Sequence, residues 1–468
     1  MRKIAHSFVF VIAMMLLTSG CGQVNSGQAK VAGTAEASAT SNSTAAATDS
    51  TENTEKEVIP EGKTVVNFWH SMTSGVNNEA IKKIVDNFNK TNTENIYVKQ
   101  TPQGSYNDCS AKLMQAIAAN NNPEICMLDR ALIPQYAPLN ALEDLTPYAE
   151  KDKVDIDDFI SGLMAFSKVD GKLLSLPFNR STPVFYWNKT AFKEVGLDPD
   201  TPPTTYDELY QYAEKLTKVE NGKTIRYGFE MIIDSGWYLM GMIQQQGKKM
   251  LSDDGQKVLF TEDGSGLKAL TYWKEFRDSG YCKIPETTDA GTAQLQNFYQ
   301  GKLAMIYAST GSLAAVIKNT EAAGTFDVGV GYMMKFDTQS CPTGGANLVL
   351  LSNSKSEKKQ PAWNFLKFAT NTENAAQWSV DTGYVPTRKS AAETEIIKSL
   401  WKEHPQYQIA YDQLEYANDT CYGQYFWEYN TMMNKIVSTL IQDGKITPEE
   451  AIQQMKDEAA RLFPGNKS

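Results

Sequence analysis

Histidine is scarce in this sequence, and its scarcity excludes several kinds of catalytic centre. The 468 residues contain three histidines, and His6 lies in an N-terminal signal segment, which leaves His70 and His404 for the body of the protein. Two histidines are too few for a histidine metal cluster, and a Ser-His-Asp triad would have to use one of them. The G-x-S-x-G, G-x-x-x-x-G-K-[ST] and G-x-G-x-x-G patterns are also absent. The sequence therefore indicates neither a metal nor a cofactor.

Positive charge is in deficit as well. Lys and Arg number 45 against 55 Asp and Glu, which gives a formal charge of -10. An acidic protein lacks the basic surface that nucleic acids require, so we expect no nucleic-acid partner. Hydrophobic residues make up 41% and charged residues 21% of the chain, as in soluble globular proteins. The length exceeds that of one ordinary domain, which predicts two lobes.

Cysteines with a recognisable spacing are missing. Apart from Cys21, the cysteines are Cys109, Cys126, Cys282, Cys341 and Cys421. Because they are odd in number, widely spaced and free of C-x-x-C pairs, they predict neither a disulfide framework nor a zinc site.

The N-terminus carries a targeting segment. Residues 1–20 combine Arg2 and Lys3 with a short apolar run, which is the arrangement of a signal peptide. The stretch Leu-Thr-Ser-Gly-Cys that ends at Cys21 is similar to the bacterial lipobox, so we predict a lipidated Cys21. Residues 21–60 are rich in Ser, Thr and Ala and predict a flexible tether. We therefore expect a cell-surface protein on the outer face of the bacterial cytoplasmic membrane, held there by its lipid anchor alone.

The body alternates short apolar strands with amphipathic helices. The first strands are predicted at 64–69, 96–100 and 124–128, and the first helices at 79–90 and 106–119. Successive strand-helix-strand units predict an α/β fold with mostly parallel sheets and helices on both faces.

Helix-capping residues and prolines predict where later elements begin and end. Thr205 and Thr447 are each followed by a glutamate three residues on, which predicts that each opens a helix. In the segment 173–189, two apolar runs flank Pro177 and Pro183. Since prolines interrupt strand pairing, we expect the chain to cross between lobes there.

Aromatic residues are abundant in the predicted strand ends and loops, beside glycines and small hydroxyl residues. Apolar walls with a few placed polar groups suit the binding of a sugar or polyol. The candidates are Trp69, Tyr106, Trp237, Tyr384, Tyr422, Tyr425, Phe426 and Trp427.

Several segments in order, from about Val65 to Phe463, point to one family. They read "FWHSM", "PFNRSTPVFYWNKTAFKEVGLDPDTPPTTYDEL", "STGSL", "GGANL", "TGYVPT" and "GKITPEEA". Together they resemble the family 1 extracellular solute-binding proteins of ABC importers, and within that family the glycerol-3-phosphate binders.

The resemblance implies a two-lobed periplasmic-binding-protein-like fold in which the ligand lies between lobes joined by hinge strands. It implies a first lobe of 61–181 plus 301–345 and a second lobe of 182–300 plus 346–468. It further implies ABC permease subunits as partners and a monomeric state. The implied ligand-binding residues are Trp69, Ser71, Tyr106, Arg130, Ser181, Trp237, Ser309, Gly345 and Tyr384. His70, on the opposite side of its strand from Trp69, is expected to be structural.

The sequence differs from the glycerol-3-phosphate binders at two places that affect the expected ligand. The glycerol-3-phosphate binders hold phosphate with an arginine near the C-terminus, yet no arginine lies between Arg388 and Arg461 here. This chain also has Arg130 where those proteins have a glutamate in the cleft. For a phosphate ligand, Arg130 or Arg180 would have to replace the missing guanidinium. Without such a replacement, the aromatic stretch "YGQYFW" suits a neutral sugar.

Three functions follow as hypotheses. The first is a solute-binding lipoprotein that captures a sugar or glycerol-3-phosphate-like ligand outside the cell and delivers it to an ABC permease, without enzymatic activity. The second is a secreted carbohydrate-active enzyme, because two distant carboxylates suffice for glycoside hydrolysis. The third is a surface protein that senses the same ligand.

Overall fold

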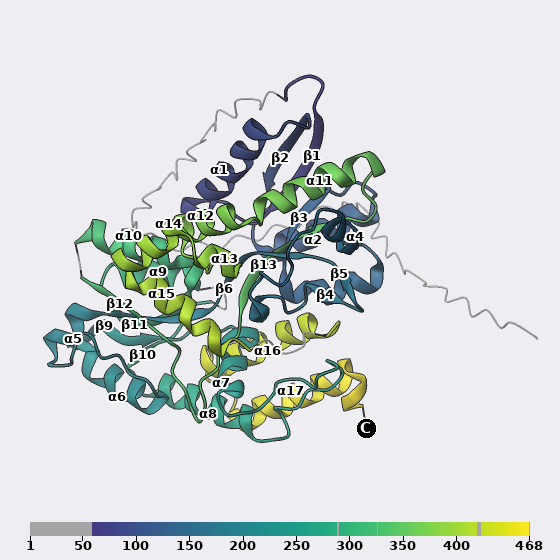
Figure 1. The fold of residues 1–468 in the computed structure, drawn as a ribbon. Coiled ribbons are helices and arrows are strands. Elements are labelled where there is room, and N and C mark those ends of the chain that lie inside the picture. Colours follow the sequence, from purple (N-terminus) through teal and green to yellow (C-terminus); the bar gives the residue numbers. More distant parts are fainter. Residues whose placement is uncertain (1–58, 288–289, 325, 419–422, 468) are drawn as a thin grey trace, which may run out of the picture. The chain divides into compact units, whose positions relative to one another are not determined.

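The computed structural model describes residues 59–287, 290–324, 326–418 and 423–467 (Figure 1). The predicted signal peptide, the predicted lipidation site Cys21 and nearly all of the predicted tether lie outside these residues, as do Cys421 and Tyr422. Within the described part of the chain, no helix combines the length and apolar character needed to span a bilayer. The other four cysteines of the body, Cys109, Cys126, Cys282 and Cys341, are buried.

The first sheet has five strands in the order β2-β1-β3-β13-β6. They are β2 (Ile96–Pro102), β1 (Thr64–His70), β3 (Ile125–Asp129), β13 (Gly344–Leu350) and β6 (Leu176–Ser181). β1 runs parallel to both β2 and β3, whereas β13 runs antiparallel to both β3 and β6.

β3 lies at the centre of this sheet because its side chains are apolar on both faces. Ile125 and Met127 belong to one core, which also contains residues of α1 (Gly75–Thr91) and α11 (Ser356–Ala369). Cys126 and Leu128 belong to the core on the other face, which α2 (Tyr106–Ala118) covers. Successive strand residues point to opposite faces, so a continuous apolar run requires helices on both.

The second sheet follows the order β10-β9-β11-β7-β12, and β8 pairs with β9. Its strands are β10 (Cys282–Lys283), β9 (Lys223–Glu230), β11 (Leu303–Ser309), β7 (Pro183–Asn188), β12 (Val328–Gly331) and β8 (Lys218–Glu220). β9 is parallel to β10 and β11, and β7 is antiparallel to β11 and β12. The expected α/β class is confirmed, but both sheets are mixed rather than mostly parallel.

The chain crosses between the sheets where the prolines predicted it. β6 ends at Ser181 in the first sheet and β7 begins at Pro183 in the second, so Thr182 alone separates them. The chain returns to the first sheet between β12 and β13.

The pairing of β11 and β12 corrects the predicted lobe boundaries. Residues 301–345 were expected in the first lobe, but β11 and β12 lie in the second sheet and only β13, from Gly344, rejoins the first. Residues 346–468 are likewise divided, because α11 packs against β1. A buried strand has the same apolar pattern in either sheet, so the sequence does not indicate its neighbours.

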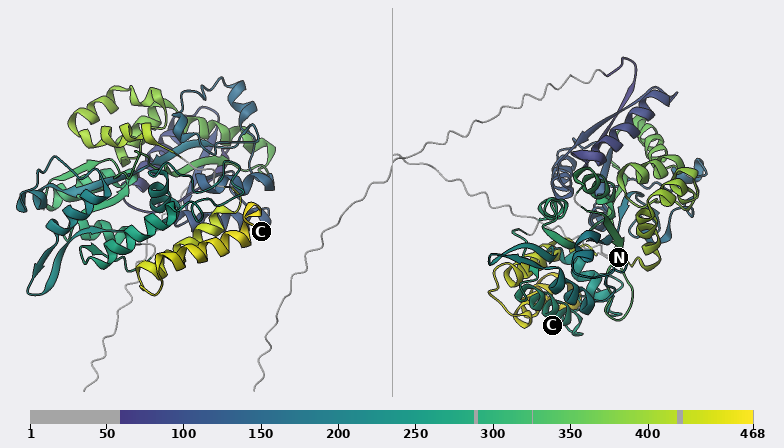
Figure 2. Two further views of the ribbon diagram at one scale, coloured as in Figure 1. Left: turned by 90° about the horizontal axis from the view of Figure 1, so that it is seen from below. Right: turned by 90° about the vertical axis from the view of Figure 1, so that its left-hand side faces the viewer.

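The C-terminal helices belong to the same hydrophobic core as strands of the second sheet. α16 (Phe426–Ile441) and α17 (Pro448–Leu462) pack against each other and against α8 (Ser265–Asp278). The left view of Figure 2 shows the yellow helices at the C-terminal end of the chain. The predicted helix starts are confirmed: Thr205 and Thr447 each accept a hydrogen bond from the backbone N–H of the glutamate three residues on, within a complete capping box.

Candidate ligand-binding site

Seven of the nine predicted ligand-binding residues line a single cavity of about 310 Å³, here called the inner cavity. They are Tyr106, Arg130, Ser181, Trp237, Ser309, Gly345 and Tyr384. Arg130 follows β3, while Ser181 and Ser309 end β6 and β11. Both sheets therefore contribute to the inner cavity through the carboxyl ends of their strands, where α/β proteins commonly bind ligands.

The other two predicted residues do not line the inner cavity. Trp69 is paired with Cys126 across β1 and β3 and packs against the core under α2. Ser71 follows β1 and is half-buried. The predicted cleft-facing position of Trp69 is therefore not observed, because the pleat of β1 turns its indole toward α2.

Sequence reasoning missed several lining residues, of which Asp129, Asp234 and Asn430 are polar. Asp129 follows the predicted strand 124–128 directly, and Asp234 lies three residues before Trp237. Asp129 could have been predicted as a lining residue, because its carboxylate stands at the carboxyl end of a predicted buried strand. Asn430 lies within α16, and nothing in its sequence context distinguishes it from a surface residue.

The two candidate arginines have different surroundings. Arg180 is fully buried, and its guanidinium donates to the carbonyl oxygen of Gly344 at 2.9 Å and to Oδ1 of Asn347 at 3.3 Å. It does not line the inner cavity. Arg130 does, and its Nε donates to Oγ1 of Thr343 at 3.3 Å while another guanidinium nitrogen lies 3.4 Å from Oδ1 of Asp129. Arg130 therefore reaches the cavity, whereas Arg180 fastens β6 to β13.

Among the described residues that line the inner cavity, two carry carboxylates, Asp129 and Asp234, and one, Arg130, carries a guanidinium. Burial raises the pKa of Asp234 to about 6; Asp129 adds to this rise, and Arg130 opposes it. Asp129 also accepts a hydrogen bond from the backbone N–H of Ala131 at 2.8 Å. At neutral pH the cavity therefore offers more acceptor charge than donor charge, which suits hydroxyl groups and opposes an added anion.

Two adjacent glycines let the backbone of β13 form part of the wall. A Cβ on Gly345, whose φ is +85°, would lie 1.8 Å from the carbonyl oxygen of Asn179. A Cβ on Gly344 would lie 2.9 Å from both Oγ of Ser181 and Cζ2 of Trp237. The indole of Trp237 thus rests against a strand that only glycine permits at this distance. Trp237 itself lies in a π-helical turn, Ser235–Leu239, a distortion that is frequent at functional sites.

Two tyrosines and an asparagine form a hydroxyl-rich corner. Nδ2 of Asn179 donates to the phenol oxygen of Tyr106 at 2.5 Å. Burial and the neighbouring Tyr384 raise the pKa of Tyr106 well above its ordinary value, so its phenol stays neutral. The corner is therefore uncharged at neutral pH.

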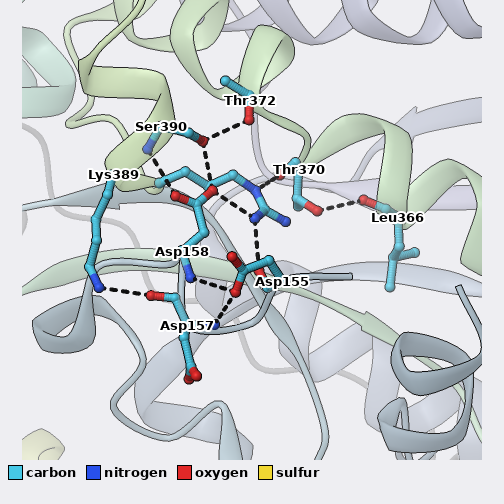
Figure 3. Close-up of polar contacts among 9 residues, drawn as sticks. Asp155, Asp157, Asp158, Leu366, Thr370, Thr372, Lys389 and Ser390 are labelled. Carbon is cyan, nitrogen blue, oxygen red and sulfur yellow. Dashed lines mark hydrogen bonds and ion pairs between the residues drawn. The ribbon is translucent and has the colours of Figure 1, made fainter. Parts of the chain in front are cut away.

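The segment after Tyr384 is held by the network in Figure 3. Arg388 donates to the carbonyl oxygen of Thr370 at 2.6 Å and to Oδ2 of Asp158 at 3.0 Å. Outside that view, its guanidinium lies 3.9 Å from the ring centre of Phe159. The hydroxyl of Ser390 donates to Oδ2 of Asp158 at 2.6 Å. Although burial acts to raise it, the hydrogen bonds from Ser390 and the pairing with Arg388 leave the pKa of Asp158 below its ordinary value.

His70 is buried and takes no part in the inner cavity. Its Nδ1 accepts the backbone N–H of Met72 at 3.2 Å, and its Nε2 contacts Oε1 of Gln100. Burial lowers the pKa of His70 to about 4, against the effect of Gln100, so the ring is neutral at pH 7. The expectation that His70 is structural agrees with these contacts. No group of three or more His, Cys, Asp or Glu side chains in the described ranges is placed to hold a metal ion.

Comparison with known proteins relates this chain to a family. Residues 83–408 match the family model described as "Bacterial extracellular solute-binding protein". The sn-glycerol-3-phosphate-binding periplasmic protein UgpB of Escherichia coli O6:K15:H31 (strain 536 / UPEC) is 30% identical over 373 residues, which cover 75% of this chain and 80% of that protein.

Solved structures show the same fold. UgpB from Mycobacterium tuberculosis in complex with glycerophosphocholine superposes with a TM-score of 0.75 at 24% identity, covering 86% of this chain and 98% of that one. The substrate-binding protein Lmo0181 from Listeria monocytogenes in complex with cycloalternan gives a TM-score of 0.74 at 21% identity, covering 85% and 98%. The two-lobed architecture expected from the sequence is confirmed by these similarities.

Proposed function

Because this chain belongs to the bacterial extracellular solute-binding proteins, we propose that it captures a sugar or polyol outside the cell and delivers it to an ABC importer. The lining of the inner cavity carries the proposal. It combines the aromatic surfaces of Trp237, Trp427 and Tyr384 with two carboxylates and several hydroxyl groups. Aromatic faces pack against the C–H faces of sugar rings, and carboxylates accept hydrogen bonds from sugar hydroxyls.

Binding proceeds without covalent chemistry. The first sheet contributes Asp129, Arg130 and Ser181, and the second contributes Ser309, so a ligand in the cavity contacts both at once. A ligand that contacts both lobes stabilises their closed arrangement by its differential affinity for it. The closed form is then the one that docks on the permease subunits.

The charge of the cavity favours a neutral ligand over a phosphate. Arg130 is the only cationic side chain among the described lining residues, and Thr343 and Asp129 already engage its guanidinium. A phosphate would meet Asp129 and Asp234 in the same cavity. Glycerol 3-phosphate or its diesters form the second candidate class, because the curated relative at 30% identity is named for glycerol 3-phosphate.

Isothermal titration calorimetry of the purified protein separates the two classes. We expect heat of binding from at least one neutral mono- or oligosaccharide and none from glycerol 3-phosphate or glycerophosphocholine. Trp237→Ala should weaken that binding by about tenfold or more, because a large aromatic contact is lost. Trp69→Ala, which alters another half-buried tryptophan outside the cavity, serves as the matched control.

Other results would change the assignment. Binding of the phosphate compounds alone, abolished by Arg130→Gln, would establish the second class. Release of a product from any oligosaccharide during the incubation would favour a carbohydrate-active enzyme, and binding without permease-dependent uptake would favour a sensor.

The location is part of the proposal. We propose that Cys21 carries a diacylglyceryl group that anchors a monomeric protein to the outer face of the cytoplasmic membrane. Cys21→Ala should release the protein from washed cells into the medium. Retention of this variant in the membrane fraction would contradict the lipid anchor.

A further inference from the structure

Two cysteine side chains meet in the core beneath α2. Sγ of Cys109 in α2 lies 3.6 Å from Sγ of Cys126 in β3. Both side chains are almost fully buried, and both belong to the hydrophobic core that α2 covers. The cysteine spacing predicted no disulfide framework, because these two residues are 17 positions apart and only the packing of α2 on β3 brings them together.

The separation of the two sulfur atoms is close to that of a covalent bond. Bonded cysteine sulfurs are about 2.05 Å apart, so an approach of roughly 1.5 Å would join this pair. Free thiols are uncommon in proteins outside the cell, where surrounding oxidants convert neighbouring pairs into disulfides. A pair of thiols in contact is therefore a candidate for this modification.

Each cysteine also stands three residues from a residue that lines the inner cavity. Cys109 follows Tyr106 by one helical turn, and Cys126 precedes Asp129 on β3. The phenol oxygen of Tyr106 accepts a hydrogen bond from Asn179, so its position depends on where the first turn of α2 lies. A covalent bond between the cysteines would fix the helix that carries Tyr106 to the strand that carries Asp129.

We propose that Cys109 and Cys126 form a disulfide bond in the exported protein. One cysteine attacks a small external disulfide and forms a mixed disulfide with it, and the other cysteine then displaces the remaining external thiol. In sum, the two cysteines lose their protons and form one S–S bond, while the external disulfide is reduced to two thiols. Because the folded protein buries both sulfurs, the exchange takes place before α2 packs on β3. This inference rests on the proposed location outside the cell, since the cytoplasm keeps thiols reduced.

Peptide mapping tests the bond directly. Trypsin cuts after Lys112, so Cys109 falls in the peptide 100–112 and Cys126 in the peptide 113–130. Protein isolated from cells that export it is alkylated with iodoacetamide in denaturant, without a reductant, and then digested. We expect the two peptides to be joined and to separate in dithiothreitol. The same protein made in a reducing cytoplasm should give two separate, alkylated peptides.

Thermal unfolding measures what the bond contributes to stability. A bond across 17 residues restricts the unfolded chain, so the exported protein should melt about 3 °C or more above the same protein reduced and refolded in dithiothreitol. Cys109→Ala should melt at one temperature under both conditions. Cys282→Ala is the matched control, because Cys282 is also buried but its Sγ donates to the carbonyl oxygen of Lys283 at 3.5 Å. This variant should keep the difference between the two conditions.

The outcomes separate this proposal from the others. Unlinked peptides from the exported protein, or a link from either cysteine to a different one, would overturn the disulfide, and this result needs no variant that folds. A Tm of the parent protein that does not depend on reduction would overturn the bond as a constraint on α2. Neither measurement uses a ligand, so absence of saccharide binding would overturn the proposed function alone. Absence of the protein from the exported fraction would instead overturn the proposed location.

Discussion

Arg130 and Arg180 both donate hydrogen bonds to the hydroxyl oxygen of Thr343, Arg130 at 3.3 Å through its Nε. One guanidinium lines the inner cavity and the other lies buried between β6 and β13. Thr343, the residue before β13, therefore couples the cavity wall to the strands at which the chain crosses between sheets.

Thr343→Val should lower the free energy of unfolding by about 1–3 kcal/mol, because two buried charged donors lose a shared acceptor. Urea denaturation measures this change. Thr93→Val, at an exposed turn, should stay within about 0.5 kcal/mol of the parent protein. Equal stability of the two variants would show that the shared hydroxyl contributes nothing.

Stability should decrease as the pH falls from about 6.5 to 4 because of His70. The unfolded chain takes up a proton near the ordinary pKa of 6.5, whereas burial delays protonation in the folded state to about pH 4. The folded state therefore loses up to ~3 kcal/mol relative to the unfolded state across this window. In His70→Gln, the slope of unfolding free energy against pH should be shallower there than in the parent protein. An unchanged slope in His70→Gln would show that His70 is not the titrating group.

Ligand affinity should decrease as the pH falls through about 6 because of Asp234. Above this pKa its carboxylate accepts charge-assisted hydrogen bonds from ligand hydroxyls, and protonation weakens them. Calorimetric titrations between pH 5 and 7.5 with the best saccharide measure the effect. Asp234→Asn should give an affinity that does not change with pH. Asp253→Asn, which alters an exposed carboxylate, should leave the pH dependence of the parent protein in place. A flat profile in the parent protein would mean that Asp234 does not contact the ligand.

Arg388→Ala should destabilise the fold by about 3 kcal/mol or more, since it leaves the largely buried Asp158 without its cation. Arg461→Ala removes an exposed pair with Glu428 and should cost at most about 1 kcal/mol. Thermal and urea unfolding of both variants provide the comparison. Similar losses for the two would mean that the network in Figure 3 contributes no more than a surface ion pair.

The sequence predicted those features that depend on local pattern. The apolar run of β3, the capping boxes at Thr205 and Thr447 and the crossing between Pro177 and Pro183 each follow from neighbouring residues. Sheet membership of β11 does not, because its partners β7 and β9 are far away in the chain. The same distinction explains which residues of the inner cavity could be predicted from the sequence. Tyr106 and Trp237 belong to recognisable motifs, whereas Asn430 reaches the cavity only through the packing of α16.

The order of strands in the two sheets determines when each sheet can be completed during translation. The first sheet receives β13 between β3 and β6, and that strand ends at Leu350. By the time a ribosome has released Leu350, every strand of the second sheet has already been synthesised. The half that contains the first strand therefore cannot complete its sheet before the other half is translated, as successive domains commonly do. The last strand of each sheet, β12 in the second and β13 in the first, is synthesised late, and pairings between strands distant in sequence form slowly.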